Sequence, residues 1–342
     1  MPNPAPNSAC TLIHELSRHI EEVLRDLLAG QTRCALLDCP THANVGDNAI
    51  WLGERAYLRR AGIQVDYLCS HRTYSESRLR ARIGSGPILL SGGGNLGDLW
   101  PEHQRLREAV IRAFPANKII QFPQSIHFED PGNLARARAI FDAHPDLTLL
   151  LRDRRSLELA RSEFRSPGLL CPDMGFALGP LPRTQPANTD LLCLLRQDAE
   201  SAGHAAAPAW GDAIRTDWPG DQPSPNLSLS LLLAGQRQRH PRLAERCAPL
   251  LAPLYRRAWE GLARERVQRA CSVLSRGRVV VTDRLHGHIL SLLLGIPHVI
   301  LDNRVGKVRG FHDTWTHRSG LVRLAQTLEE AAALAREWIG QN

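Results

Sequence analysis

The stretch VVVTDRLHGHILSLLLGIPHVILD (279–302) decides the fold, because two short apolar runs flank a helical pattern. We predict a buried strand at 278–283, a helix at 286–295 and a second buried strand at 297–302. Two strands joined by a crossover helix form a parallel βαβ unit. The stretch therefore indicates an α/β protein built on a parallel sheet.

The same alternation runs through the first half of the chain. Apolar strands that alternate with helices of this length favour a doubly wound sheet covered by helices on both faces. Strands are expected at 34–39, 63–68, 87–94, 118–123 and 147–153, and helices at 11–29, 48–62, 102–114, 131–143 and 154–164.

A proline-rich break at LGPLPRTQPAN (178–188) divides the chain. A length of 342 residues suits two cores, so we expect a first lobe over 1–180 and a second over 189–326. The second lobe should contain a strand at 190–196, an irregular insertion at 199–228 and a long helix at 244–275. The remainder, 327–342, is expected to be helical, with a return to the first lobe as one arrangement.

The composition indicates which kinds of ligand the protein binds. A net charge of +7 without a dominant basic block favours an acidic small substrate, and only 5% aromatic residues argue against a nucleic-acid platform. The eight cysteines are scattered without a C-x-x-C pair, which suits a reducing compartment and predicts no metal site. Without a signal peptide or an apolar run of about 18 residues, we expect a cytoplasmic protein. Peripheral attachment to the inner face of the membrane is a second option.

Two similar loops, NVGDNA (44–49) and NLGDLW (95–100), each follow a predicted strand and precede a helix. Ligands bind at such positions in open α/β sheets, which makes Asn44, Asp47, Asn48 and Asp98 candidates for acceptor binding. The alternative is that Asp47 and Asp98 are helix N-caps, which satisfy free backbone amides and contact no ligand.

The segment SGGGN (91–95) sets three glycines after a buried strand. Its backbone is expected to cradle a phosphate, a carboxylate or a sugar, through Gly92, Gly93, Gly94 and Asn95. Neither G-x-G-x-x-G nor the G-K-[ST] of a P-loop is present, so a dinucleotide or nucleoside triphosphate is not expected.

QFPQSIHF (121–128) places amides and an imidazole after a predicted strand end. Gln124 and His127 there suit sugar hydroxyls, although a proline-shaped loop hydrogen-bonded to itself is the better explanation of this segment when it is taken alone.

Arg152 ends the apolar run LTLLLRD (147–153). An arginine at the carboxyl end of a strand is suited to clamp a carboxylate or phosphate. A salt bridge to Asp153 or Asp173 is the competing interpretation.

The junction within 279–297 is the most informative motif. Arg284 and His286 stand between a buried strand and a helix, where a fixed cation, helix amides and a titratable ring coincide. Further on, Lys307, Arg309 and His312 are expected to form a mobile rim.

These segments together resemble the polysaccharide pyruvyl transferase family, in particular its bacterial exopolysaccharide branch. The likeness runs in order from about residue 36 to 315, and it fades only in the insertion at 199–243. It is carried by THANVGDNAIWLG, SGGGNLGDLWP, QFPQSIHF, LLRDRRSLELA, CPDMGFAL, LLRQDAE and TDRLHGHILSLLLGIP.

The resemblance implies two Rossmann-like lobes, similar to B-type glycosyltransferases, with the active site in the interlobe cleft. It implies phosphoenolpyruvate as donor, a sugar acceptor that is lipid-linked in one version, and a pyruvate ketal on a hexose as product. Arg152, Arg284 and His286 would lie at the donor. His286 would supply a proton and Arg284 would hold the phosphate, without a cofactor or a metal.

The sequence leaves the general base and two alternative functions open. Asp47, Asp98 and His127 are the candidates for the group that accepts the hydroxyl proton. A nucleotide-sugar-dependent glycosyltransferase shares the two-lobed plan, and a non-catalytic subunit of a polysaccharide assembly complex is the third interpretation.

Overall fold

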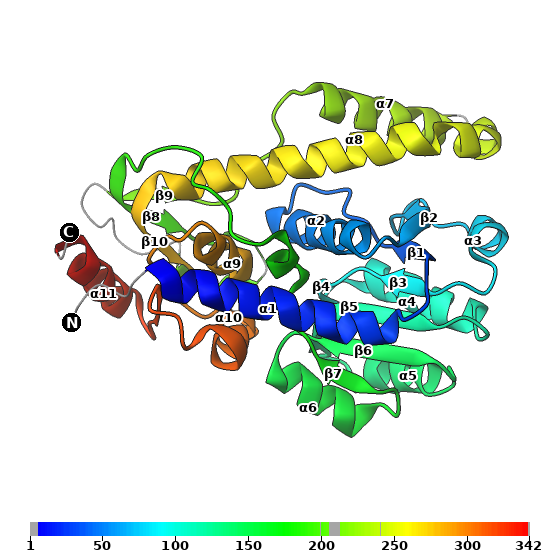
Figure 1. Ribbon diagram of the computed structural model, residues 1–342, viewed down its shortest axis with the longest axis horizontal. Helices are drawn as coiled ribbons and strands as arrows, with labels where there is room; N and C mark the ends of the chain where they lie inside the picture. The colour runs from blue at the N-terminus through cyan, green and yellow to red at the C-terminus, as the bar shows by residue number, and fades with distance from the viewer. Residues whose placement is uncertain (1–5, 199, 205–212, 240, 341–342) are drawn as a thin grey trace.

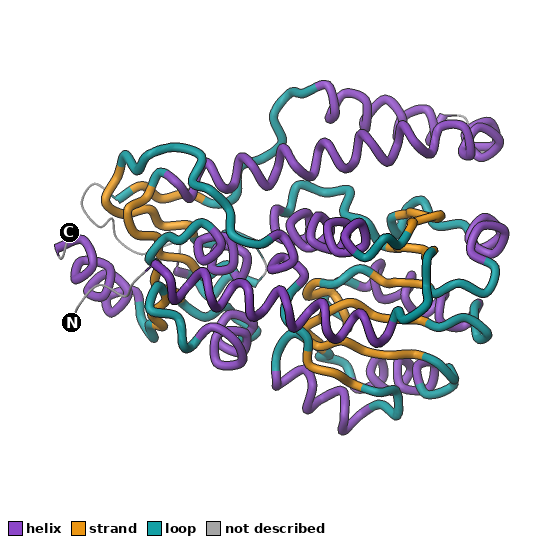
Figure 2. Tube along the Cα trace, in the orientation of Figure 1, coloured by secondary structure: helices purple, strands orange, loops and turns teal. Residues whose placement is uncertain are grey.

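The computed structural model contains two lobes, each a parallel sheet flanked by helices (Figures 1 and 2). It describes residues 6–198, 200–204, 213–239 and 241–340. Part of the expected insertion at 199–228 and the outermost ends of the chain therefore lie outside the described residues. The predicted α/β class, with two Rossmann-like lobes similar to B-type glycosyltransferases, is confirmed.

The first lobe has a seven-stranded sheet in the order β2-β1-β3-β5-β6-β7, with β4 paired to β5. Its strands are β1 (Arg33–Leu37), β2 (Gln64–Cys69), β3 (Ile88–Leu90), β4 (Gly93–Gly97), β5 (Ile119–His127), β6 (Leu147–Leu151) and β7 (Gly168–Leu170). Its helices are α1 (Pro6–Leu27), α2 (Val45–Arg60), α3 (Glu76–Ile83), α4 (Pro101–Ala113), α5 (Pro131–Phe141), α6 (Arg154–Glu163) and the short η1 (Met174–Leu178).

Two predicted loops of this lobe are strands. The segment QFPQSIH belongs to β5, and the glycine segment forms β4, which pairs with β5 through Gly93 and Gln124. Gly93 and Gly97 take φ angles of 135° and 129°, which glycine alone adopts readily. The glycines therefore shape an irregular strand, and the residues after Phe122 remain inside the sheet.

The second lobe has a five-stranded sheet in the order β12-β11-β10-β8-β9. Its strands are β8 (Thr189–Leu194), β9 (Ile214–Thr216), β10 (Gly277–Thr282), β11 (His298–Ile300) and β12 (Val322–Leu324). Its helices are α7 (Pro225–Arg239), α8 (Pro241–Ser275), α9 (Leu285–Leu293), α10 (Lys307–Phe311), η3 (His312–Thr316) and α11 (Leu328–Gly340). The expected irregular insertion thus contains β9 and the start of α7.

Helices α7 and α8 pack along one another and form an arm beside the lobes (Figure 1). With 35 residues, α8 is about 50 Å long. Its inner end joins the second sheet, and its middle contacts α2 of the first lobe. None of the helices that the structure describes is both long and apolar enough to span a bilayer.

The return of the C-terminal helix to the first lobe is wrong. Helix α11 packs on β10 and β11 of its own lobe. Its apolar face, formed by Ala331, Ala335 and Trp338, shares a core cluster with Leu191 and Val281 of the second sheet. That sheet has an apolar face to cover, and α11 follows directly after β12, the last strand of the sheet along the chain.

A continuous apolar core joins the lobes. It includes Ile20 of α1, Trp51 of α2, Phe176 of η1 and Ile289 of α9. Gly53 of α2 lies so close to η1 that a Cβ there would meet the carbonyl oxygen of Met174 at 1.8 Å. This packing holds the carboxyl ends of both sheets toward each other.

Candidate active site

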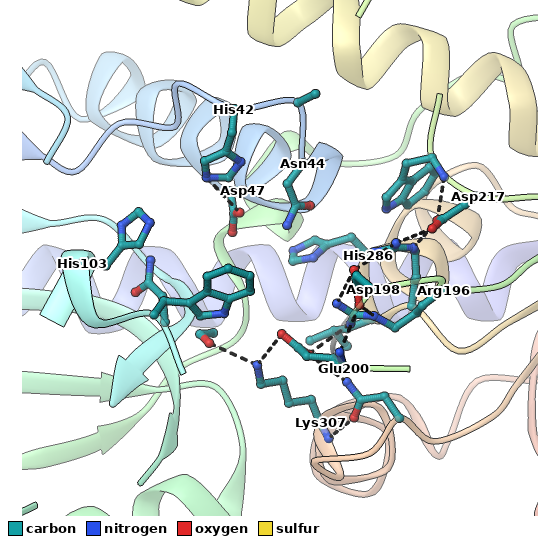
Figure 3. A pocket seen from close by; sticks show the side chains of 18 of the residues that line it. His42, Asn44, Asp47, His103, Arg196, Asp198, Glu200, Asp217, His286 and Lys307 are labelled. Carbon is teal, nitrogen blue, oxygen red and sulfur yellow. Dashed lines mark hydrogen bonds and ion pairs between the residues drawn. The ribbon is translucent and has the colours of Figure 1, made fainter. Parts of the chain in front are cut away.

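A cavity of about 570 Å³ lies between the lobes. Its walls come from Gly94 of β4 and from the segments that follow β1, β2, β6, β8, β9, β10 and β11 (Figure 3). Open parallel sheets bind ligands at these strand ends. The predicted residues that line it are Asn44, Asp47, Gly94, Asn95, Arg152, Arg284 and His286.

Arg152 is held from two sides at the end of β6. Its Nη1 donates to Oδ2 of Asp173 at 2.7 Å, and its Nε donates to the Ser125 hydroxyl at 2.9 Å. Only 3% of Arg152 is exposed, yet the side chain lines the cavity. Both interpretations of the sequence are therefore combined, because the bridge to Asp173 orients an arginine that faces the cavity.

Asp173 links Arg152 to His286. Its carboxylate is fully buried, and Oδ2 lies 3.5 Å from Nε2 of His286. Burial alone would raise the pKa of Asp173, but His286 and Arg152 together hold that pKa well below the usual range. The ionised carboxylate of Asp173 therefore stands as a fixed anion between two residues of the cavity.

His286 lies in the first turn of α9 and reaches the first lobe. A Cβ on Gly46, in the first turn of α2, would lie 2.3 Å from Nδ1 of His286. The glycine therefore allows the ring to fit between two helix N-termini, where backbone amides favour anions.

Arg284 is fixed by two acids that the sequence did not single out. Its Nη2 donates to Oδ2 of Asp217 at 2.6 Å and to Asp198 at 3.2 Å, while Nε also bonds Asp217. A guanidinium fixed in this way retains Nη1 for a ligand. Asp198 follows β8 within the segment LLRQDAE that carried the resemblance, while Asp217 follows β9 in the insertion that resembled no motif.

Lys307 is a cavity residue and not part of a mobile rim. It is 8% exposed, and its Nζ donates to the carbonyl of Gly94 at 3.1 Å and to Glu200 at 3.2 Å. A Cβ on Gly94 would lie 3.0 Å from that Nζ and 2.9 Å from Nη2 of Arg152. Gly94 thus lets two cations approach the same edge of the cavity.

Fewer residues form the glycine cradle than predicted. The amide of Gly92 donates to Glu54 at 2.7 Å, so it is not available to a ligand. Burial raises the pKa of Glu54 to about 8, despite the hydrogen bonds from Gly92 and Ser91. Gly93 does not line the cavity, so the predicted cradle consists of Gly94 and Asn95 alone.

Four predicted acceptor residues do not line the cavity. Asn48 is buried and bonds the carbonyls of His42 and Asn44. Asp98 accepts from the amides of Glu129 and Asp130, and so anchors the turn before α5. The others, Gln124 and His127, lie in β5, bonded to Asn95 and to Glu129 respectively. These residues do follow or end apolar runs, but their side chains form hydrogen bonds within the protein and not with the cavity.

Sequence reasoning missed a cluster at the first-lobe wall. Asp38, His71 and His103 bring one ligand-type atom each within 4.8 Å of one another, a spacing that would suit a metal ion. Asp38 follows β1, His71 follows β2, and His103 lies in the first turn of α4. No recognisable sequence spacing links the three positions. Only the order of the strands in the sheet could have indicated their proximity.

Comparison with known proteins finds relatives over most of the chain. The sequence profile described as "Polysaccharide pyruvyl transferase" matches residues 44–304. The chain is 34% identical to pyruvyl transferase 1 of Schizosaccharomyces pombe, over 91% of this chain and 77% of that protein. It is 31% identical to a Bacillus subtilis protein named as a putative pyruvyl transferase, EpsO, over 89% of this chain and 91% of that protein.

The fold also has a solved counterpart. A Klebsiella pneumoniae protein described as uncharacterized superposes with a TM-score of 0.60 and 18% identity, over 91% of this chain and 99% of that one. The sequence matches and the shared fold lead to one assignment. The chain belongs to the polysaccharide pyruvyl transferase family and is a transferase.

Proposed function

We propose that the protein transfers pyruvate from phosphoenolpyruvate to a hexose of an exopolysaccharide repeat unit, forming a pyruvate ketal. The observation that carries the proposal is that Arg152, Arg284 and His286 line one cavity although 134 residues separate the first from the last. Lys307 adds a third cation. Phosphoenolpyruvate carries a carboxylate and a phosphate, and cations held by buried acids are suited to bind both.

The chemistry needs one proton donor and one proton acceptor. His286 gives a proton to C3 of the donor, which leaves C2 open to attack by an acceptor hydroxyl. The C2–O bond to phosphate breaks, and a second hydroxyl closes the ketal. Of the two hydroxyl protons released, one replaces the proton given to C3 and the other leaves with phosphate. Arg284 and Arg152 stabilise the charge on the departing phosphate and on the carboxylate.

A thermal-shift experiment tests the donor. Phosphoenolpyruvate at about 100 times its Kd stabilises the native state by about 2.7 kcal/mol, which raises the Tm by several degrees. UDP- and GDP-sugars are expected to leave the Tm unchanged, because the cavity lacks a nucleotide-binding glycine motif.

The rival interpretations predict other results. A Tm raised by a nucleotide sugar and not by phosphoenolpyruvate would replace the proposal with a nucleotide-sugar-dependent glycosyltransferase. A Tm raised by neither, together with no turnover, would point to a non-catalytic subunit of a polysaccharide assembly complex.

We further propose that the acceptor is lipid-linked and that the protein works at the inner, cytoplasmic face of the membrane. The support comes from the arm formed by α7 and α8. Residues 225–259 contain six arginines and one glutamate. Four leucines of the arm are exposed, by 63%, 58%, 82% and 39%, namely Leu231, Leu232, Leu250 and Leu254. Basic helices with exposed apolar side chains bind anionic bilayer surfaces.

The arm begins beside the cavity. Trp218 and Gly220 line the cavity shortly before α7, and Asp221 pairs with Arg266 of α8 at 2.7 Å. Arg266 in turn donates to the carbonyl of His42 on the opposite lobe at 2.8 Å. A membrane-bound arm would therefore bring the cavity mouth close to lipid-anchored sugars.

Vesicle co-sedimentation tests the arm. The double variant Leu231→Gln/Leu232→Gln is expected to bind phosphatidylglycerol vesicles at least tenfold more weakly than the wild type, because two leucines no longer enter the interface. Leu169→Gln, at a 39%-exposed site on β7, is the matched control and should bind like the wild type. Equal binding by the double variant, or equal binding to phosphatidylcholine, would contradict the proposal.

A further inference from the structure

Asp38 orients His103 at the first-lobe wall of the cavity. Asp38 follows β1 with a φ of 69°, a left-handed conformation that turns its carboxylate toward α4. Oδ2 lies 2.7 Å from Nδ1 of His103, and Oδ1 lies 3.7 Å from Nδ1 of His71. Asp38 is 8% exposed and His103 is 9% exposed, so both depend on each other for hydrogen bonding.

The pair fixes which nitrogen of His103 carries the proton. Burial would raise the pKa of Asp38, but the hydrogen bond with His103 and the nearby ring of His71 lower that pKa well below the usual range. An ionised Asp38 can only accept, so Nδ1 of His103 donates to it. Nε2 of the neutral ring then presents a lone pair, and it has no hydrogen-bond partner among the residues that the structure describes. Because His103 lines the cavity, that lone pair is available to a ligand.

The surroundings of His103 suit a sugar. Trp100, which directly precedes α4, lines the cavity and is 41% exposed, an unusual exposure for so large an apolar ring. An aromatic ring left open in a polar cavity marks a binding surface for a partly apolar ligand. Figure 3 shows His103 with His42 and Asp47 on the first-lobe side, across the cavity from Arg196, Asp198 and Asp217.

We propose that His103 is the general base of the transfer reaction and that Asp38 is its positioning residue, an inference that rests on the proposed function. Nε2 of His103 takes the proton of the acceptor hydroxyl as that oxygen bonds to C2 of phosphoenolpyruvate. The proton then returns to the cavity, where it serves C3 or leaves with phosphate, so atoms and charges balance. The acceptor sugar would lie against Trp100, between His103 and the donor.

The other acid–histidine pair of this wall is less suited to the task. His42 and Asp47 are 3.6 Å apart, and their side chains are 42% and 29% exposed. A solvated pair at that distance does not fix the tautomer of the ring or its direction. The remaining candidates from the sequence, Asp98 and His127, lie outside the cavity.

Kinetics of His103→Gln and His103→Ala test the proposal. Both variants are expected to lose roughly 10²–10⁴ in kcat, while the Tm shift with phosphoenolpyruvate stays that of the wild type. Imidazole in the buffer should restore part of the rate of His103→Ala, and Asp38→Asn should lower kcat while the KM for phosphoenolpyruvate stays that of the wild type. His127→Ala, outside the cavity, is the matched control with wild-type kinetics.

The outcomes separate the proposal from its alternatives. A wild-type kcat in both His103 variants would overturn the role of the base. A chelator that abolishes wild-type turnover, restored by a divalent metal, would overturn it in favour of a metal held by Asp38, His71 and His103. If phosphoenolpyruvate does not shift the Tm of the wild type, the proposed function itself fails, whichever variant is studied.

Discussion

Replacing His286 by alanine is expected to reduce pyruvyl transfer by roughly 10²–10⁴ while the fold stays intact. The ring is the one imidazole of the cavity that contacts the Asp173–Arg152 pair, with Nε2 3.5 Å from the buried carboxylate. Asp173 holds the ring at the cavity, where it can deliver a proton to C3 of the donor. The measurement is kcat with phosphoenolpyruvate and a sugar acceptor, at saturating donor.

The control for this variant is a histidine of the same lobe without access to the cavity. His317→Ala removes an exposed ring, and its kcat should equal that of the wild type. The Tm of His286→Ala shows whether the fold survives. Near-wild-type turnover by a folded His286→Ala protein would remove this residue from the mechanism and return the question of the acid to the other groups of the cavity.

The alternation of apolar runs and helical patterns was sufficient to predict the architecture. The predicted strands from 34–39 to 147–153 correspond to β1, β2, β3, β5 and β6 of a single parallel sheet. Arg152 and Arg284 were recognisable for the same reason, because each directly follows an apolar strand whose carboxyl end must face the ligand. Strand ends are therefore a strong local signal for the position of a site residue.

The predictions that Asp98 and His127 bind the acceptor failed for a different reason. Asp98 and His127 also follow or end a strand, but the extra pairing of β4 with β5 extends the sheet and directs these side chains to the turn before α5. Pairing between short, glycine-rich segments depends on long-range contacts that a single sequence does not reveal.

The site residues that the sequence did not indicate show the same dependence on long-range contacts. Asp217 fixes Arg284 from an insertion that resembles no motif, and Asp198 fixes it from a motif whose contact with Arg284 no local pattern predicts. Asp38 meets His103 only because β1 lies beside β3 and α4 follows β4. Local patterns indicate which residues stand at strand ends. Tertiary packing decides which of them meet.

Neutralising either clamp arginine is expected to have the second large effect, on donor binding. Arg152→Gln and Arg284→Gln should each raise the KM for phosphoenolpyruvate, because a buried charged hydrogen bond to an anion is lost. Such a loss costs about 2–5 kcal/mol, or roughly 30-fold to several thousand-fold in affinity. The effect of Arg152→Gln should be the larger, because it also removes the guanidinium that pairs with Asp173 at 2.7 Å and leaves that buried carboxylate with His286 and the amide of Gly175.

Arg154→Gln provides the comparison for both variants. Arg154 lies two residues from Arg152, but its side chain is exposed and does not line the cavity, so its loss should leave the KM unchanged. A fall in donor affinity for all three variants would mean that general positive charge, and not a clamp, attracts the donor. Unchanged donor affinity in Arg152→Gln and Arg284→Gln would reject the clamp, since two preorganised cations that face one small anion cannot both be without effect on its binding.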